Sequence, residues 1–551
     1  MNNVIHSYKQ QPELLHQTYD AVVIGSGIGG LSFAAIMAKE GKRILVLERH
    51  YTAGGFTHSF KRRGYEWDVG IHYLGEVHRP HTDLANWFTY ITDGQMEWED
   101  MGQVYDKIIF GQKIYEFHAG KENFISNLQL QFPAAADQQA IEDYVKLLYY
   151  ATNAARTFFA EKALPAPLAW AFGGLMRRKY LQLSNQTTYD VLSSLTQNKQ
   201  LIGVLSGQYG DYGMTPKTSS FAVHALVAKH FLNGGCFPVG GCSRIADTIA
   251  AVITQAGGNV LTNAEVAHIK VKNNKATGIV MSDGAEINSP LIISDAGIVN
   301  TYHYLLSKEV QEELKLPQQL EQVKPSVSHI ALYLGFKKTA EELGLTKANL
   351  WIYPEDGYDH DANMENYLQN PDTAPFPLVY ISFPSAKDPD WQNRYPGTAT
   401  VDVITFAPYE WFEKWEETRW KKRGVDYDTW KEQTTQRLLK VLYQYVPQLE
   451  GEVDYHELST PLSTKHFANY QHGELYGIEH SPHRFSLRFL KPQTPITNLY
   501  LTGQDIASAG VGGALTGGVL TAAALLKRDV PGIIRKRVME SKLLSTPKSS
   551  T

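Results

Sequence analysis

Residues 20–48, DAVVIGSGIGGLSFAAIMAKEGKRILVLE, decide the fold. An apolar run at 21–24 leads into a glycine-rich turn, and apolar residues then recur at helical spacing as far as Glu40. Gly41 ends this predicted helix, and a second apolar run at 44–47 is closed by Glu48. Strand, glycine turn, helix and strand in this order form a βαβ unit. The sequence therefore predicts an α/β protein with a Rossmann-type domain.

The glycine turn has the spacing GxGxxG, with Gly25, Gly27 and Gly30 at its glycine positions. Such a turn lets backbone N–H groups approach a pyrophosphate, and the helix that starts near Gly29 points its positive end at the phosphates. Glu48 is placed to accept hydrogen bonds from ribose hydroxyls, and its charge disfavours a 2′-phosphate. We therefore predict an ADP-binding turn, with a purely structural glycine turn as the alternative.

Two features further along the chain favour FAD over NAD. Gly54 and Gly55 follow the predicted ribose-binding acid closely, which suits a loop that folds back over the cofactor. An apolar run at 498–502 precedes a glycine-rich loop and a helix beginning near Gly512, which supplies a second helix N-terminus. A second complete GxGxxG unit is absent from the sequence. We predict bound FAD and retain NAD(P)H only as a candidate external reductant.

The order of these patterns predicts a domain built from three segments. Residues 17–77, 234–300 and 485–529 are assigned to the FAD-binding domain, with an antiparallel meander after residue 258. Residues 78–233 and 301–484 hold most of the Trp and Tyr residues and are assigned to an interleaved α+β substrate domain. Residues 530–551 are predicted to be a basic C-terminal tail, partly disordered.

Composition excludes several classes of protein. A net charge of −5 over 551 residues leaves no broad cationic field, so we expect no nucleic-acid partner. Cys236 and Cys242 have neither zinc-site nor disulfide-framework spacing, so no metal is predicted. The first 19 residues contain no apolar run of signal-peptide length, and no segment has the roughly 20 apolar residues of a spanning helix. We expect a cytoplasmic protein.

Residues 158–180 suggest contact with a membrane surface. This stretch combines an apolar set with a basic fringe at 177–179, which suits peripheral attachment at the inner face of a membrane. A helix pair that packs onto the substrate domain is the alternative. The apolar set is Phe158, Phe159, Leu164, Trp170, Phe172, Leu175 and Met176.

Several longer stretches resemble the flavin amine-oxidase-like superfamily, and within it the branch of carotenoid desaturases, carotenoid isomerases and retinol saturases. The resemblance covers most of the chain from about residue 19 to residue 526. Its general motifs are VVIGSGIGGLSFAAIMAKEGKRILVLERH, AGGFTHSF, EWDVGIHYLGE, FPVGGCSRIADTI, AEVAHIKV and LYLTGQDIASAGVGGALTGG. YGDYGMTP, SFAVHALVAKHFLNGG and GELYGIEHSPHRF look most like retinol saturases.

The resemblance implies an FAD-dependent oxidoreductase that acts on a carbon–carbon double bond of a polyene lipid, most like a retinol saturase. Carotenoid desaturation and cis–trans isomerisation stay open as alternatives, as does a non-enzymatic lipid-binding escort. The implied cofactor-binding positions are Gly25, Gly27, Gly29, Gly30, Glu48, Arg49, Gly54, Gly55, Val266, Gly503, Asp505 and Gly512. The candidate proton donors, each also compatible with a structural role, are Tyr209, Asp211, Tyr212, His224, Glu474 and Tyr476.

Overall fold

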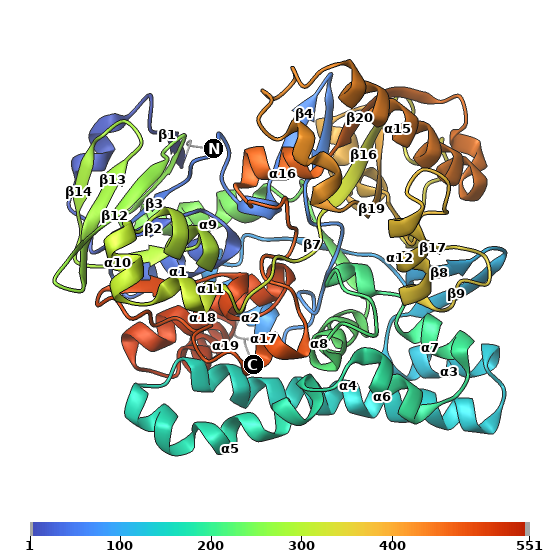
Figure 1. The fold of residues 1–551 in the computed structure, drawn as a ribbon, viewed down its shortest axis with the longest axis horizontal. Coiled ribbons are helices and arrows are strands. Elements are labelled where there is room, and N and C mark those ends of the chain that lie inside the picture. Colours follow the sequence, from blue (N-terminus) through green and yellow to red (C-terminus); the bar gives the residue numbers. More distant parts are fainter. Residues whose placement is uncertain (1–3, 546–551) are drawn as a thin grey trace, which may run out of the picture.

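A six-stranded parallel sheet forms the centre of the first lobe (Figure 1). The computed structural model describes residues 4–545. The strands lie in the order β1 (Ile5–Ser7), β11 (Asn259–Thr262), β3 (Ile44–Leu47), β2 (Ala21–Ile24), β15 (Ile292–Ser294) and β21 (Leu499–Leu501). Each neighbouring pair is parallel. The predicted Rossmann-type fold is therefore confirmed.

Three helices pack around this sheet: α1 (Ile28–Lys39), α9 (Arg244–Gln255) and α18 (Gly510–Leu526). Almost all of α1 is buried, because its residues are small or apolar on every face. Gly518 lets α18 approach α1 closely, since a Cβ at this position would lie 2.6 Å from the carbonyl oxygen of Gly29. The N-termini of both helices therefore lie near the same edge of the sheet.

A separate antiparallel meander, β12 (Val266–Lys272), β13 (Lys275–Met281) and β14 (Glu286–Asn288), lies beside this lobe (Figure 1). Asn273 and Asn274 form its first turn with φ of 52° and 54°. Asparagine adopts this left-handed conformation more readily than most residues. The predicted meander is therefore present.

A seven-stranded sheet forms the core of the second lobe. Its order is β20 (Val453–Ser459), β16 (His329–Phe336), β19 (Ala399–Phe406), β18 (Val379–Ser382), β17 (Asn349–Tyr353), β8 (Val104–Phe110) and β9 (Lys113–His118). Strand β8 pairs with β17 in parallel, which joins a strand from the first half of the chain to strands from the second half. The other neighbouring pairs are antiparallel.

Helices surround the second lobe, and α4 (Ala135–Lys162) and α5 (Ala166–Ser184) run along the lower edge in Figure 1. The remaining helices of the described chain, on either lobe, are α2 (Asp83–Ile91), α3 (Lys121–Gln131), α6 (Thr188–Leu195), α7 (Lys199–Leu205), α8 (Phe221–Phe231), α10 (Lys308–Glu313), α11 (Leu316–Leu320), α12 (His360–Gln369), α13 (Pro384–Lys387), α14 (Trp391–Arg394), α15 (Val425–Tyr445), α16 (Pro461–Ala468), α17 (Pro482–Ser486) and α19 (Val530–Ser545). The short strands are β4 (Ser59–Arg62), β5 (Tyr65–Asp68), β6 (Leu74–Gly75), β7 (Trp98–Asp100) and β10 (Gly235–Pro238).

Both ends of the described chain contribute to the first lobe. Strand β1 pairs with β11, so the sheet begins upstream of residue 17. Helix α19 occupies most of the segment expected to be a partly disordered tail. It packs because Val530, Ile534 and Val538 recur at helical spacing and are buried, while Arg535 pairs with Asp83 at 2.9 Å. The expected tail residues 546–551 lie outside the described residues.

A helix that crosses a membrane must be both long enough and apolar enough to span the bilayer. Between residues 4 and 545, no single helix meets both requirements. Helices α18 and α19 meet them only when taken together, and they are bent by 106° relative to each other.

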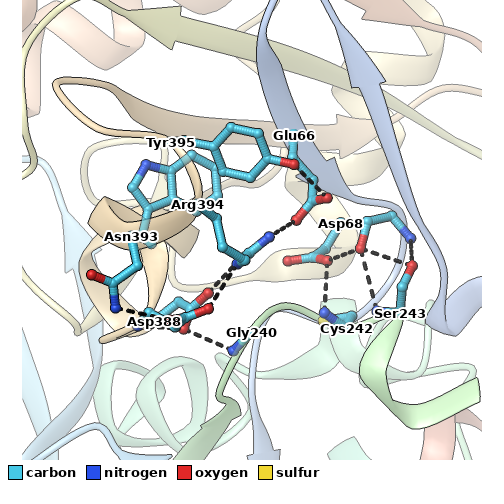
Figure 2. Close-up of polar contacts among 12 residues, drawn as sticks. Glu66, Asp68, Gly240, Cys242, Ser243, Asp388, Asn393, Arg394 and Tyr395 are labelled. Carbon is cyan, nitrogen blue, oxygen red and sulfur yellow. Dashed lines mark hydrogen bonds and ion pairs between the residues drawn. The ribbon is translucent and has the colours of Figure 1, made fainter. Parts of the chain in front are cut away.

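A buried ion-pair cluster joins the two lobes (Figure 2). The Arg394 guanidinium at the end of α14 donates to Glu66 of β5 and, at 2.5 Å, to Asp388. Asp388 also accepts a 3.0 Å hydrogen bond from the backbone N–H of Gly240. Both carboxylates are nearly inaccessible to solvent, so water cannot stabilise their negative charges. The guanidinium of Arg394 stabilises them instead.

Replacing this arginine is expected to destabilise the protein. Arg394→Met removes the cation that both buried carboxylates share and leaves Glu66 only the 3.5 Å contact with the exposed Lys61, so it should lower the free energy of unfolding by about 3 kcal/mol. Urea denaturation followed by tryptophan fluorescence measures the change. Lys217→Met is the control, because Lys217 pairs with Asp359 at the surface and should cost less than about 1 kcal/mol. Equal losses in the two variants would contradict the role assigned to Arg394.

Candidate functional site

A cavity of about 1690 Å³ extends from the glycine turn of the first lobe into the second lobe. This volume exceeds the roughly 300–1,000 Å³ of an ordinary small-molecule pocket. Backbone and polar groups of the first lobe line one part. Mainly apolar and aromatic side chains line the other, among them Leu226, Tyr333, Leu378, Ile404 and Phe406. The cavity is therefore large enough for a long ligand beside a second, apolar one.

The glycine turn adopts the geometry that the motif predicts. Gly25 has φ of 97°, a conformation that favours glycine, and its N–H donates to the carbonyl of Leu47 at 2.8 Å. A Cβ at Gly27 would lie 2.5 Å from a carboxyl oxygen of Asp295, and one at Gly30 would lie 2.6 Å from the carbonyl oxygen of Gly25. Side chains at Gly27 and Gly30 would therefore collide with protein atoms that already pack against the start of α1.

Glu48 lies at the end of β3 and organises the turn. One of its carboxylate oxygens accepts hydrogen bonds from the backbone N–H and the hydroxyl of Ser26, at 3.0 and 2.7 Å. The other accepts from the N–H of His50 at 2.8 Å. Arg49 also lines the cavity, but its guanidinium already contacts Glu265 and the carbonyl of His466. Glu48 thus faces the cavity in a fixed orientation.

The other predicted cofactor positions converge on the same wall. Gly54, Gly55, Val266, Gly503, Asp505 and Gly512 all line the cavity, together with Gly25, Gly27 and Gly29, whereas Gly30 packs behind them. The Asp505 carboxylate accepts from the backbone N–H groups of Ile298 and Ile478, at 2.8 and 3.2 Å. Asp505 therefore ties three loops together at the edge of the sheet.

Asp295, which the sequence motif did not single out, follows β15 and lies directly at the N-terminus of α1. Burial, opposed by backbone hydrogen bonds from Gly30 and Gly27, raises the pKa of this carboxyl to about 8. It is therefore mainly neutral at pH 7. An acidic residue after a buried strand was visible in the sequence, but nothing there placed it beside the glycine turn.

The candidate proton donors separate into two groups. Asp211 and Tyr476 line the cavity, and the Tyr476 hydroxyl donates to the carbonyl of Gly210 at 3.0 Å. Tyr209, Tyr212 and His224 instead lie in the helical core. The His224 ring is held between the hydroxyls of Tyr212 and Tyr144, at 3.1 and 2.9 Å.

The placement of this second group favours the structural role that the sequence left open for it. Tyr209, Tyr212 and His224 are not among the residues that line the cavity in the described part of the chain. Their side chains are buried in the core, where their polar atoms bond to other buried side chains or to backbone. Glu474 is also not among the residues that line the cavity in the described chain. Its carboxylate accepts a hydrogen bond from the backbone N–H of His472.

One cluster bears on the predicted absence of a metal, which stays a prediction. Cys236 Sγ lies 2.8 Å from Nδ1 of His78, and a carboxylate oxygen of Asp100 completes a group of atoms within 4.8 Å of one another. These residue types can ligate a metal. The short sulfur–nitrogen distance is that of a thiol–imidazole hydrogen bond.

Residues 158–180 are only partly exposed. Phe158 and Phe159 are buried in the core, which corrects their assignment to a surface face. The exposed set lies on α5, where Leu168, Phe172 and Leu175 share one face at helical spacing and Trp170 is 88% exposed. Leu168 also lines the cavity. We call these four residues the α5 patch.

The fold and the site together define a dinucleotide-binding protein with an attached ligand chamber. The family model "Flavin containing amine oxidoreductase" matches residues 28–526, and the chain therefore belongs to this family.

Named relatives and solved structures agree with this placement. An all-trans-retinol 13,14-reductase of Danio rerio is 38% identical, covering 93% of this chain and 86% of the relative. A 1-hydroxycarotenoid 3,4-desaturase of Flavobacterium sp. is 25% identical, covering 89% of this chain and 95% of the relative. A crystal structure of an oxidoreductase from Methanosarcina mazei is 18% identical, with a TM-score of 0.60 and coverage of 92% and 100%, and shows the fold.

Family membership implies a flavin, and the residues of the first lobe fit one. Gly27 and Gly29 line the cavity without a side chain, so their backbone is open to a ligand, and the first residues of α1 and α18 also line it. Glu48 offers a carboxylate at the position expected for a ribose. The neutral Asp295 carboxyl adds no negative charge beside a phosphate at pH 7.

This protonation predicts a pH-dependent flavin affinity. Asp295 becomes negatively charged above about pH 8 and should then repel a pyrophosphate, so FAD binding should weaken by up to about tenfold per pH unit. Fluorescence quenching of FAD by apoprotein between pH 7 and 9.5 measures this. Asp295→Asn should remove the dependence, whereas Asp372→Asn, which changes an exposed carboxyl, should retain it. An unchanged affinity in the wild type across this range would disprove the repulsion.

Proposed function

We propose that the protein is an FAD-dependent reductase that saturates a carbon–carbon double bond of a polyene alcohol or related lipid. The observation that carries this proposal is the single continuous cavity, which joins the flavin-binding turn to an apolar chamber in the other lobe. The 38% identity to an all-trans-retinol 13,14-reductase over most of both chains supports a conjugated substrate of that kind. NAD(P)H stays a candidate for the external reductant.

The residues of the chain would bind and orient the two ligands. Helix N-termini and Glu48 hold the dinucleotide part of FAD, and the apolar chamber holds the polyene and excludes water from the reacting bond. When bound in its reduced form, FAD supplies a hydride. The second hydrogen must come as a proton from a group in the cavity wall, and Asp211 and Tyr476 are the two sequence candidates placed there.

The reaction can be identified from the mass of its product. Holoprotein reduced with dithionite under anaerobic conditions is incubated with all-trans-retinol, and a gain of two hydrogens is expected by mass spectrometry. Gly27→Val is the matched control, because its side chain would meet Asp295 and exclude the cofactor.

Three other outcomes would each replace the proposal. Loss of hydrogen in a parallel incubation with the oxidised holoprotein indicates desaturation, the activity named for the Flavobacterium relative. Unchanged mass with altered retention indicates isomerisation. Wild-type protein that binds no flavin even when FAD is added indicates a lipid-binding escort.

We also propose that the α5 patch rests on a membrane surface and that lipid substrate enters beside it. Phe172 and Leu175 are 56% and 76% exposed, and exposed basic residues follow at Arg178 and Lys179. Apolar side chains with a basic fringe match an anionic bilayer surface. Leu164 and Leu168 line the cavity next to the patch, which supports a route from the bilayer into the chamber. The cytoplasmic location expected from the sequence stays a prediction.

Vesicle binding tests this attachment. The triple variant Trp170→Ser, Phe172→Ser and Leu175→Ser should bind phosphatidylglycerol-containing vesicles at least about tenfold more weakly in co-sedimentation, because each side chain loses apolar area that the bilayer would cover. Leu130→Ser is the control, since Leu130 is 82% exposed on α3. The attachment is excluded if both proteins bind as the wild type does.

A further inference from the structure

A buried and a half-buried carboxyl group meet at the wall of the substrate chamber. Asp106 lies in β8 and is inaccessible to solvent, whereas Asp211 ends a short turn at 209–211 and lines the cavity. The hydroxyl of Tyr73 lies between them, 2.9 Å from Oδ2 of Asp106 and 3.1 Å from Oδ2 of Asp211. These three side chains therefore form one hydrogen-bonded unit.

Hydrogen bonds decide which carboxyl holds the negative charge. Besides Tyr73, Asp106 accepts from the side-chain amides of Gln208 and Asn349, at 2.7 and 2.9 Å. Within the described residues, Asp211 has a side-chain hydrogen bond only with Tyr73. Because donors favour the ionised form of a carboxyl, the charge is more stable on Asp106.

The single hydroxyl proton of Tyr73 then sets the direction of the bonds. Tyr73 donates to the charged Asp106, so its oxygen is free to accept from a protonated Asp211. Burial, followed by the nearby charge of Asp106, raises the pKa of Asp211 well above its usual range. Two carboxyls in different environments thus divide into an anion and an acid.

Among the described residues, the titratable groups that interact electrostatically with Asp211 include no partner at hydrogen-bond distance besides Tyr73. They are the carboxyl of Asp106 and the hydroxyls of Tyr73, Tyr212, Tyr353, Tyr380 and Tyr476. Lys387 lies near Asp106, and burial lowers the pKa of its amino group to about 7. Its Nζ donates to the carbonyl of His72, the hydroxyl of Ser382 and the side chain of Asn349, and not to Asp211.

Asp211 also lies next to the loops of the flavin lobe. The preceding residue, Gly210, accepts a hydrogen bond from Tyr476. Two residues beyond Tyr476, the N–H of Ile478 donates to Asp505 at the edge of the parallel sheet. A short chain of contacts therefore links the acid to the wall expected to hold the flavin.

We propose that Asp211 is the acid that protonates the substrate double bond, with Tyr73 and Asp106 as the residues that position it and keep it protonated. This inference rests on the proposed function. The double bond receives a hydride with its electron pair from bound reduced FAD on one carbon. The other carbon uses the π-electron pair to bond to the Asp211 proton. Asp211 is left as a carboxylate that Tyr73 can stabilise, and it regains a proton from solvent.

Two variants test the assignment. Asp211→Asn should retain flavin absorbance and retinol binding but reduce the double bond at least about 100-fold more slowly. Wild-type activity should fall as the pH rises through the pKa of Asp211. Removing the neighbouring charge in Asp106→Asn lowers that pKa, so this alkaline limit should move down by about one pH unit or more. A purely structural role for Asp106 would lower activity without moving the limit.

Infrared spectroscopy of the oxidised holoprotein gives a readout that does not depend on turnover. The difference between the wild-type and Asp211→Asn spectra should contain a protonated-carboxyl band, from which the neutral Asp295 cancels. This band should titrate at lower pH when Asp106 is also replaced by Asn. Asp247→Asn, which changes a carboxyl on α9 outside the chamber, should leave the Asp211 band and the rate unchanged.

The possible failures are distinguishable. Wild type that forms no hydrogenated product overturns the proposed function. Active wild type with an equally active Asp211→Asn variant overturns only the assignment of Asp211. The assignment also fails if that infrared difference spectrum contains no protonated-carboxyl band, or if Asp106→Asn leaves both its midpoint and the alkaline limit unchanged.

Discussion

The close approach of three backbone segments at the start of α1 is the constraint on which the rest of the structure depends. The glycine turn, the loop after β15 and the loop after β21 meet there with no room for extra side-chain atoms. A Cβ at Gly29 would lie 2.5 Å from Cα of Gly503, although the two residues are far apart in the chain. This packing leaves the positive end of α1 facing the cavity.

The interleaving of the two lobes follows from this arrangement. Because the parallel sheet takes its strands from the beginning, middle and end of the chain, the intervening segments must form a lobe beside it. The ion-pair cluster around Arg394 then fixes one lobe against the other (Figure 2). A cavity between lobes held in this way can position two ligands relative to each other, which a redox reaction between them requires.

Burial controls the charge of the cavity wall. Asp295 and Asp211 would be anions in water, yet at pH 7 their surroundings favour the neutral forms. The neutral form suits both positions, since one faces an expected phosphate and the other is proposed to give up a proton. Glu48 is bonded differently, since its two carboxylate oxygens accept hydrogen bonds from Ser26 and His50.

The sequence alone was sufficient for the glycine turn of the first lobe. Strand, turn, helix and acid are contiguous in residues 20–48, so their spacing reports their geometry directly. The same reasoning was weaker for the proton donors. Tyr209, Asp211 and Tyr212 are neighbours in the chain, yet only Asp211 lines the cavity, because side chains in a tight turn point in different directions.

The tertiary structure alone decided which distant residues share a function. Tyr73 and Asp211 are 138 positions apart, and Asp295 reaches the glycine turn only because β15 pairs with β2. Helix α19 likewise forms against α2, where burial of its apolar residues outweighs a basic composition. Periodicity describes which face of an element is apolar. Which elements meet, and therefore which carboxyl keeps its proton, depends on packing between segments that the chain order leaves far apart.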